Sequence, residues 1–170
     1  MTQEFLDLRS SILEGRYDDA LAIVDELEGM SKQAIIRNIE SFLERLMIHL
    51  IKNQIEQILT NFWANSISDS IRQIKKLNLK DNKTSYYING DEWQSLFEEN
   101  LEAAIRPASL EVLNGQLKPK QLSARLDKEQ LIEFAQKLID LTYTYSAKDL
   151  PGVVDDVLAR LPGGEEWYGD

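Results

Sequence analysis

Apolar residues recur at intervals of three and four positions along almost the whole chain. Because an α-helix has about 3.6 residues per turn, this spacing puts the apolar side chains on one side of a helix, where they can pack against a neighbour. The pattern therefore predicts an all-α fold, a single-domain bundle of six or seven helices.

The longest helix is predicted over about residues 31–59, beginning at Ser31. Its apolar stripe is broad and consists of Ile35, Ile39, Phe42, Leu43, Leu46, Leu50 and Ile58. We expect this helix to be the central element against which the other helices pack.

Two shorter helices are predicted before the central one, over residues 3–14 and 18–29. Gly15 is expected to end the first of them, because glycine adopts a left-handed backbone at low cost. Gly29 is expected to end the second for the same reason.

Further helices are predicted after the central one, over residues 61–77, 91–115, 127–145 and 151–161. The polar residues 78–90 contain the turn dipeptide Asn89-Gly90 and are predicted to form a loop. Pro107 lacks an amide hydrogen and crowds the preceding turn, so we expect it to kink or split its helix. Asp127 is expected to cap the helix that follows it.

No segment has the composition of a linker, so we predict one domain over residues 1–164, followed by a short acidic tail over residues 165–170. The Pro-Gly-Gly sequence before the tail is expected to end the last helix. We expect the tail to be loose rather than docked, with Trp167 as the side chain that would attach it.

The composition narrows the classes of function. The chain has no cysteine, which excludes disulfides, thiolate metal ligands and a thiol nucleophile. Its first residues lack the basic start and apolar run of a signal peptide, and its longest apolar stretches are interrupted by His49, Lys52 and Asn53. Neither a glycine-rich phosphate loop nor a G-x-S-x-G turn is present. These features predict a cytoplasmic protein that does not span a membrane and for which we expect no cofactor.

The charge of the chain is strongly acidic, with 29 acidic and 19 basic residues and a net charge of −10. Because nucleic-acid binding depends on Lys and Arg that neutralise phosphates, this balance predicts no nucleic-acid partner. The charge is uneven: residues 1–29 carry −6, residues 30–90 carry +4, and the remainder carries −8. The basic residues of segment 30–90 either face acidic residues of the same chain or contact an acidic partner.

The basic residues are most concentrated in the segment that holds Arg72, Lys75, Lys76, Lys80 and Lys83. A spacing of three and four places Arg72, Lys75 and Lys76 on one face of their helix. Such a face is commonly solvated, and the alternative is a contact site for an acidic protein or an anionic ligand. Nucleic-acid binding through residues 72–83 would instead give strong, salt-dependent retention on heparin or DNA.

His49 is the only histidine, which excludes every motif that needs two. No carboxylate stands three positions before it, or three or four after it, so a metal site of the Glu-x-x-His type cannot form along this helix alone. We interpret His49 as a packed, hydrogen-bonded structural residue. The alternative is an enzyme or metalloprotein with a site assembled between helices, in which His49 acts with Glu98 or Glu102. Trp63 or Tyr143 would then line the pocket.

Several local sequences between Leu13 and Leu77 resemble a known family. They are Leu13-x-Gly15-x-Tyr17-Asp18, Glu26-Leu27-Glu28-Gly29-Met30, the run Ser41–Lys52 that ends in His49-Leu50-Ile51-Lys52, and Trp63 followed by Ser66-Ile67. The stretch resembles the helical domain-of-unknown-function family number 29, found mainly in cyanobacteria. That family has an aromatic residue where this chain has Asn53. The resemblance implies an all-helical fold and no established activity.

The missing catalytic constellation and the uneven charge favour a non-catalytic protein–protein interaction or regulatory module. Its partner is expected to be another protein, a copy of itself, or a small regulated factor such as the toxin of a toxin–antitoxin pair. We assign no catalytic and no metal-binding residue. The candidate binding residues are His49, Lys52, Trp63, Arg72, Lys75 and Lys76.

Overall fold

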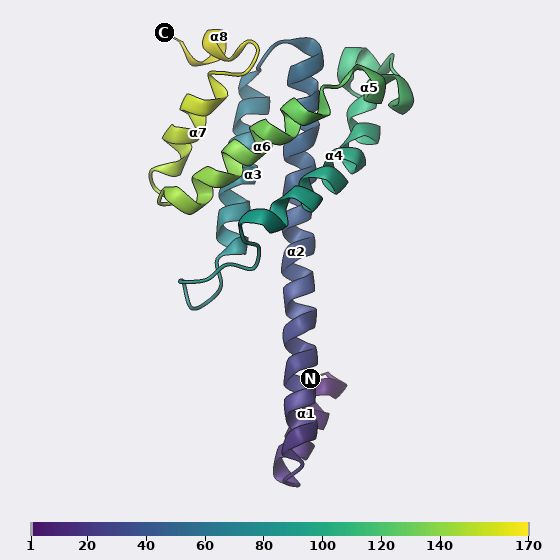
Figure 1. Cartoon of the computed structure of the whole chain (residues 1–170), viewed down its shortest axis with the longest axis vertical. Coiled ribbons are helices and arrows are strands. Elements are labelled where there is room, and N and C mark those ends of the chain that lie inside the picture. The colour runs from purple at the N-terminus through teal and green to yellow at the C-terminus, as the bar shows by residue number, and fades with distance from the viewer. Residues whose placement is uncertain (1, 170) are drawn as a thin grey trace. The chain divides into compact units, whose positions relative to one another are not determined.

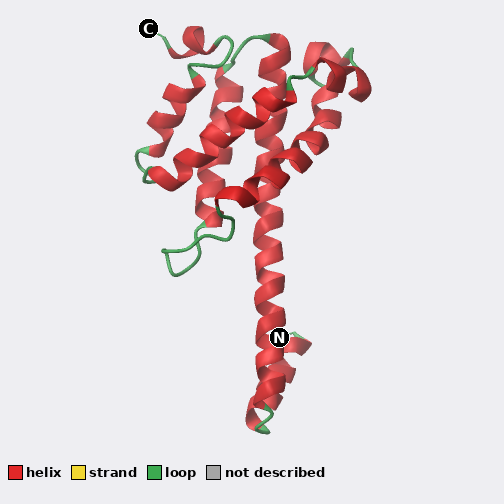
Figure 2. Cartoon of the chain, in the orientation of Figure 1, coloured by secondary structure: helices red, strands yellow, loops and turns green. Residues whose placement is uncertain are grey.

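The computed structural model describes residues 2–169 (Figure 1). Within that range every regular element is a helix, apart from an isolated antiparallel bridge between Leu79 and Tyr86 (Figure 2). The all-α fold class predicted from the apolar spacing is therefore confirmed. The described residues form eight α-helices, slightly more than the six or seven expected.

The α-helices are numbered in chain order, and two short 3-10 helices, η1 and η2, flank α4. Their bounds are α1 (Gln3–Leu13), α2 (Tyr17–Glu56), α3 (Asn61–Asn78), η1 (Gly90–Glu92), α4 (Trp93–Ser109), η2 (Val112–Gly115), α5 (Pro119–Arg125), α6 (Lys128–Thr144), α7 (Leu150–Leu158) and α8 (Gly164–Tyr168). Among the described helices, none combines the length and the apolar character needed to cross a lipid bilayer.

The chain divides into two compact units, one up to Arg37 and one from Asn38 onward. The first unit consists of α1 and the first part of α2 (Figure 1), and residues of both helices line one shared hollow. Gly15 turns the chain between these helices with a φ of +75°, so the predicted stop is confirmed. Among the described residues of this unit only Ser11 and Ala20 are buried, so the two helices contribute little apolar core of their own.

The predicted break at Gly29 is wrong, because α2 runs without interruption from Tyr17 to Glu56. The helices predicted over residues 18–29 and 31–59 are one helix. A glycine inside a helix costs only about 1 kcal/mol relative to alanine. Ending one helix and starting another would instead leave backbone amide and carbonyl groups that need capping partners. Strong helix formers on both sides of Gly29 also favour continuity.

The second unit is built from the later part of α2 together with α3 to α8. Within it α6 packs against α3, α4 and α7, and α3 also packs against α7. The large side chains that are fully buried include four from the centre of the predicted stripe, namely Ile39, Leu43, Leu46 and Leu50. Opposing apolar residues come from the other long helices, among them Ile67, Ile71, Ile74, Trp93 and Phe97.

The polar segment predicted as a loop, residues 78–90, connects α3 to η1 and is tied to the core at both ends. The Asn78 side chain donates to the Ile88 carbonyl at 3.0 Å and accepts from the Ile88 amide at 2.7 Å. The Tyr143 hydroxyl of α6 accepts from the Trp93 indole at 2.7 Å and donates to the Ile88 carbonyl. These buried polar groups are paired with one another, so the loop ends are fixed by the core.

The helix predicted over residues 91–115 ends earlier, at Ser109, and residues 112–115 form the separate element η2. Pro107 does not split the helix, because α4 runs through it and stops two residues beyond it. The proline therefore lies in the last turn, where it can stop the helix but has little helix left to interrupt. After η2 comes α5, which the apolar pattern missed although Pro119 stands at its start. Asp127 caps α6 as predicted, its side chain accepting from the Gln130 amide at 3.1 Å.

The expectation that the acidic tail is loose is wrong, because residues 164–168 form α8. The Trp167 indole donates to the Asn61 side chain at 3.1 Å, and the Tyr168 hydroxyl donates to Asp156. A backbone with φ of +73° at Gly163 brings the chain against the backbone of residues 58 and 59, where a larger side chain would clash. Trp167 is thus the side chain that attaches the tail.

Candidate functional site

Three of the six candidate binding residues come together where α2 meets α3. His49 and Lys52 lie about one turn apart on α2. Trp63 lies in the first turn of α3, where its amide donates to the Thr60 cap at 3.1 Å. Its ring centre is 4.8 Å from Lys52 Nζ, so the cap that starts α3 also places Trp63 beside Lys52.

Lys52 is buried, with only 9 % of its side chain exposed. Its Nζ lies 3.5 Å from Glu111 Oε1 and over the Trp63 ring. A buried ammonium needs such partners, because losing its hydration is costly. The cation–π contact and the ion pair therefore join α2 both to α3 and to the turn after α4, which is a structural role for Lys52.

His49 is 7 % exposed, and the Phe62 ring lies edge-on to it with 6.2 Å between ring centres. Burial, followed by the charge of Lys52, lowers the pKa of His49 from 6.5 to about 4, and the Glu111 carboxylate only partly opposes this. His49 is therefore neutral at pH 7. Its Nδ1 is buried and has no hydrogen-bond partner within the described residues, so the packing expected of His49 is found but the hydrogen bond at this nitrogen is not.

An open hollow of about 520 Å³ lies beside His49 and is lined by Arg45, His49, Phe62, Asn65, Ser66 and Asp69. Arg45 donates to Ser66 Oγ at 2.8 Å and to Asp69 Oδ2 at 3.1 Å. Hydrogen bonds from Arg72 and Arg45 lower the pKa of Asp69. The Asp69 carboxylate is thus an ion-pair partner, and the lining of this hollow offers no carboxylate that acts on His49 as an acid–base pair.

The other groups of the alternative His49 site are engaged elsewhere in the fold. Glu102 forms an ion pair of 2.7 Å with Lys128 of α6, and Glu98 accepts from the Gln94 side chain, on the preceding turn of its own helix, at 2.9 Å. Tyr143 belongs to the hydrogen-bond network of the loop. Between residues 2 and 169 no three His, Asp or Glu side chains form a group that could hold a metal ion.

The predicted cationic face of α3 is divided among different partners. Arg72 pairs with Asp69 on its own helix at 3.0 Å. Lys75 Nζ donates to the Thr142 carbonyl at 2.7 Å, near the C-terminal end of α6, where a positive charge is favourable. Lys76 is exposed and, among the described residues, has no ion pair. Two of the three residues of the predicted cationic face, Arg72 and Lys75, are therefore paired with groups of the chain itself.

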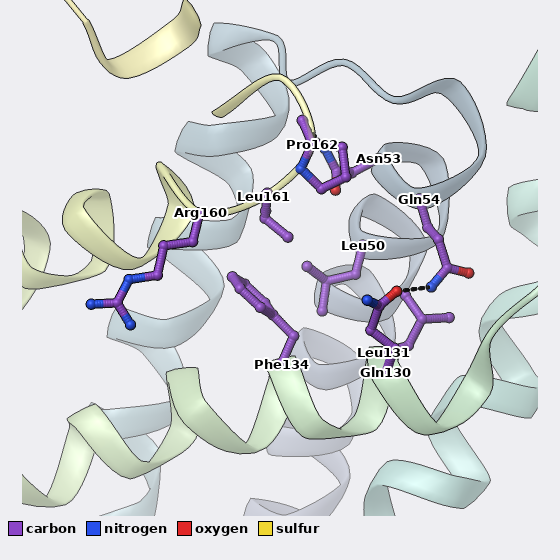
Figure 3. A pocket seen from close by; sticks show the side chains of 9 residues that line it. All are labelled: Leu50, Asn53, Gln54, Gln130, Leu131, Phe134, Arg160, Leu161 and Pro162. Carbon is purple, nitrogen blue, oxygen red and sulfur yellow. Dashed lines mark hydrogen bonds between the residues drawn. The ribbon is translucent and has the colours of Figure 1, made fainter. Parts of the chain in front are cut away.

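A second and smaller pocket, of about 100 Å³, lies between α2, α6 and the segment after α7 (Figure 3). Its polar lining is already paired: the Asn53 amide donates to two backbone carbonyls at 2.8 Å each, and Gln54 donates to Gln130 at 3.2 Å. Figure 3 shows the Arg160 side chain pointing away from the space between the apolar walls. Those walls are formed by Leu50, Leu131, Phe134 and Leu161.

Exposed apolar side chains gather in the first unit. Eight large hydrophobic residues there are between 43 and 75 % exposed, more than in the much longer second unit. We call this set the N-terminal apolar surface; it consists of Phe5, Leu6, Ile12, Leu13, Tyr17, Leu21, Val24 and Met30. The sequence did not reveal it, because an exposed apolar stripe and a buried one have the same spacing.

A family model described as Domain of unknown function DUF29 matches residues 16–134, more than half of the chain. The matched residues include α2 to α5 and the beginning of α6, and they hold His49, Lys52 and Trp63. No curated protein and no solved structure matches the chain. The match confirms the family indicated by the local sequences between Leu13 and Leu77.

Proposed function

We propose that this chain, which belongs to the family described as Domain of unknown function DUF29, is a non-catalytic protein–protein interaction module. The observation that carries the proposal is the N-terminal apolar surface, eight exposed hydrophobic side chains in a unit whose described part buries only two residues. Exposed apolar residues gathered on a short segment are typical of protein contact surfaces. The absence of cysteine suits an encounter in the reducing cytoplasm.

The energetics of the first unit favour a partner. Two helices that bury only Ser11 and Ala20 against each other gain little from their own packing, whereas covering one large hydrophobic side chain is worth about 1.5–3 kcal/mol. A partner that covers these side chains would therefore also stabilise the folded state of the two helices. This property fits a regulatory module that holds a second protein.

The surroundings of His49 support a non-catalytic role. The imidazole is neutral at pH 7, and the acidic charge that acts on it, Glu111, already pairs with Lys52. Asp69 is held by two arginines. General acid–base work needs a group whose pKa lies near the working pH and which can reach a substrate. The pKa of His49 is instead about 4, and the carboxylates of Glu111 and Asp69 are already paired with basic side chains.

Affinity capture from the native lysate tests the proposed function. Tagged wild-type chain is compared with a double variant, Leu13→Gln with Leu21→Gln, and with Leu110→Gln as the control. Leu110 lies in the second unit and, at 76 % exposed, matches the 75 % of Leu13. We expect the wild type and the control to retrieve the same protein, and the double variant to retrieve at least about tenfold less, because anchors of a contact surface carry most of its affinity.

Circular dichroism of the three proteins checks that each is folded. Retrieval of no protein above background by the wild type, at several salt concentrations, contradicts the proposed function. Equal retrieval by the double variant contradicts the assignment of docking to the first unit.

A further inference from the structure

The chemistry of the first unit indicates which kind of protein docks on it. We infer that the partner presents a basic amphipathic helix, which places its apolar face on a stripe of α2 and its Lys or Arg side chains against the acidic edge of that stripe. The inference rests on the proposed function and adds the class of the partner.

The stripe consists of Tyr17, Leu21 and Val24, which are 65, 62 and 43 % exposed. At about 100° per residue, these positions fall within about 60° of one another around the helix axis. The buried Ala20 marks the side of α2 that packs within the unit. The stripe is next to that side and faces solvent, which is the arrangement that a helix lying along α2 would need.

Carboxylates border the same stripe. Asp18 and Asp25 follow one edge at helical spacing, and Glu28 continues the stripe by one turn beyond Val24. All three are exposed, and none of them is in an ion pair within residues 2–169. Asp19, on another side of α2, is by contrast paired with Arg16 at 3.1 Å. Unpaired carboxylates beside an apolar stripe complement a helix that carries Lys or Arg beside its own apolar face.

A second copy of the chain fits this stripe less well. The first unit carries eight acidic and four basic residues, a net charge of −4. In a twofold contact the same patch meets itself, so Asp18, Asp25 and Glu28 would face their counterparts. Like charges brought together at a contact oppose association. A basic partner converts the same carboxylates into attractive neighbours.

Two synthetic peptides test the class of the partner. Each has about 18 residues, or five helical turns, and the same leucine face; one carries Lys and the other Glu at the positions that flank it. Their affinities for the full chain are measured by fluorescence anisotropy at low and at physiological salt. We expect the Lys peptide to bind at least about tenfold more tightly than the Glu peptide, with a preference that weakens as salt screens the charges.

Variants locate the binding. Leu21→Gln is expected to weaken Lys-peptide binding about tenfold or more, as the loss of a central anchor does. Asp25→Lys combined with Glu28→Lys is expected to reverse the preference toward the Glu peptide. Leu110→Gln, at a comparably exposed leucine of the second unit, is expected to leave both affinities within about twofold.

Equal affinity for the two peptides, or no binding of either, overturns the inference. So does Lys-peptide binding that Leu21→Gln leaves unchanged, since the overall charge of −10 attracts any basic peptide. A dimer in sedimentation that Leu21→Gln abolishes identifies a second copy as the occupant and also overturns it. The affinity capture from the lysate tests the proposed function independently of the peptides. If retrieval of a protein depends on Leu13 and Leu21 but the two peptides bind equally, the docking function is upheld and only the class of the partner is wrong.

Discussion

The ionisation of His49 depends on its burial next to a positive charge. The residue is 7 % exposed, and burial, followed by the charge of Lys52, lowers its pKa from 6.5 to about 4. The unfolded chain binds a proton near pH 6.5, whereas the folded chain binds it only near pH 4. Protonation of His49 therefore favours the unfolded state as the pH falls from 6.5 to 4. Above pH 6.5, titration of His49 does not change the free energy of unfolding.

We predict that His49 makes the folded state less stable as the pH falls. Urea unfolding of the wild type and of His49→Gln is compared from about pH 7.5 to about pH 4, because the variant lacks the titrating group and the difference isolates it. The advantage of the wild type over the variant is expected to decrease by about 3 kcal/mol over this range. A difference that stays constant with pH contradicts the burial of a neutral imidazole.

The residues around His49 and the partners of the basic residues on α3 were only partly predictable from the sequence. His49, Lys52 and Trp63 were indicated by their place in the family sequences and by the rarity of histidine. Glu111 was not, because its contact with Lys52 joins positions far apart in the chain and no local spacing marks it. The partners of Arg72 and Lys75 were missed for a related reason: a helical face of basic residues has the same sequence whether it meets solvent or the end of another helix.

Among the elements, α2 departs most from the prediction. The sequence marks Gly29 as a stop as clearly as Gly15, yet Gly15 has a φ of +75° and Gly29 lies inside the helix. What separates the two sites is the balance between the cost of one helical glycine and the cost of two new helix ends. That balance depends on the surrounding residues, so a single glycine does not decide it.

The continuity of α2 predicts opposite effects of alanine at the two glycines. A Cβ at Gly29 would meet nothing within 4 Å, so Gly29→Ala is expected to stabilise the folded state by about 0.5–1 kcal/mol. Gly15→Ala is the control: its Cβ also meets nothing within 4 Å, but the left-handed backbone should make it destabilising by about 1 kcal/mol. Thermal unfolding measures both, and destabilisation by Gly29→Ala contradicts a continuous helix at that position.

Long helices with a clear apolar period were predictable, and short ones were not. The boundaries near Asn61, Asp127 and Pro151 agree with the structure because capping residues or a proline in the first turn mark them. The short helices α5 and α8 were not predicted, because a helix of fewer than two or three turns has too few apolar positions to define a period. The docking of α8 depends on the distant contact of Trp167 with Asn61, which local sequence does not encode.

On the scale of the whole molecule, the apolar residues fall into two classes that periodicity does not separate. In the second unit they fill a core in which side chains such as Leu46, Ile71 and Phe97 are essentially inaccessible to water. In the first unit the same spacing leaves residues such as Leu13 and Leu21 largely exposed. The physical difference is the number of helices within each unit: the second unit contains the later part of α2 and α3 to α8, whereas the described first unit contains only α1 and the first part of α2. A second protein can supply a further helix for the first unit.

Site-specific photo-crosslinking in native cells tests the docking role of the first unit most directly. Leu21, or Leu110 as the control, is replaced by a photoreactive benzoyl-phenylalanine and the cells are irradiated. We predict a discrete protein adduct from position 21 and none from position 110, although both side chains are exposed. No adduct from position 21, or the same adduct from both positions, would contradict the claim that the N-terminal apolar surface is where a partner binds.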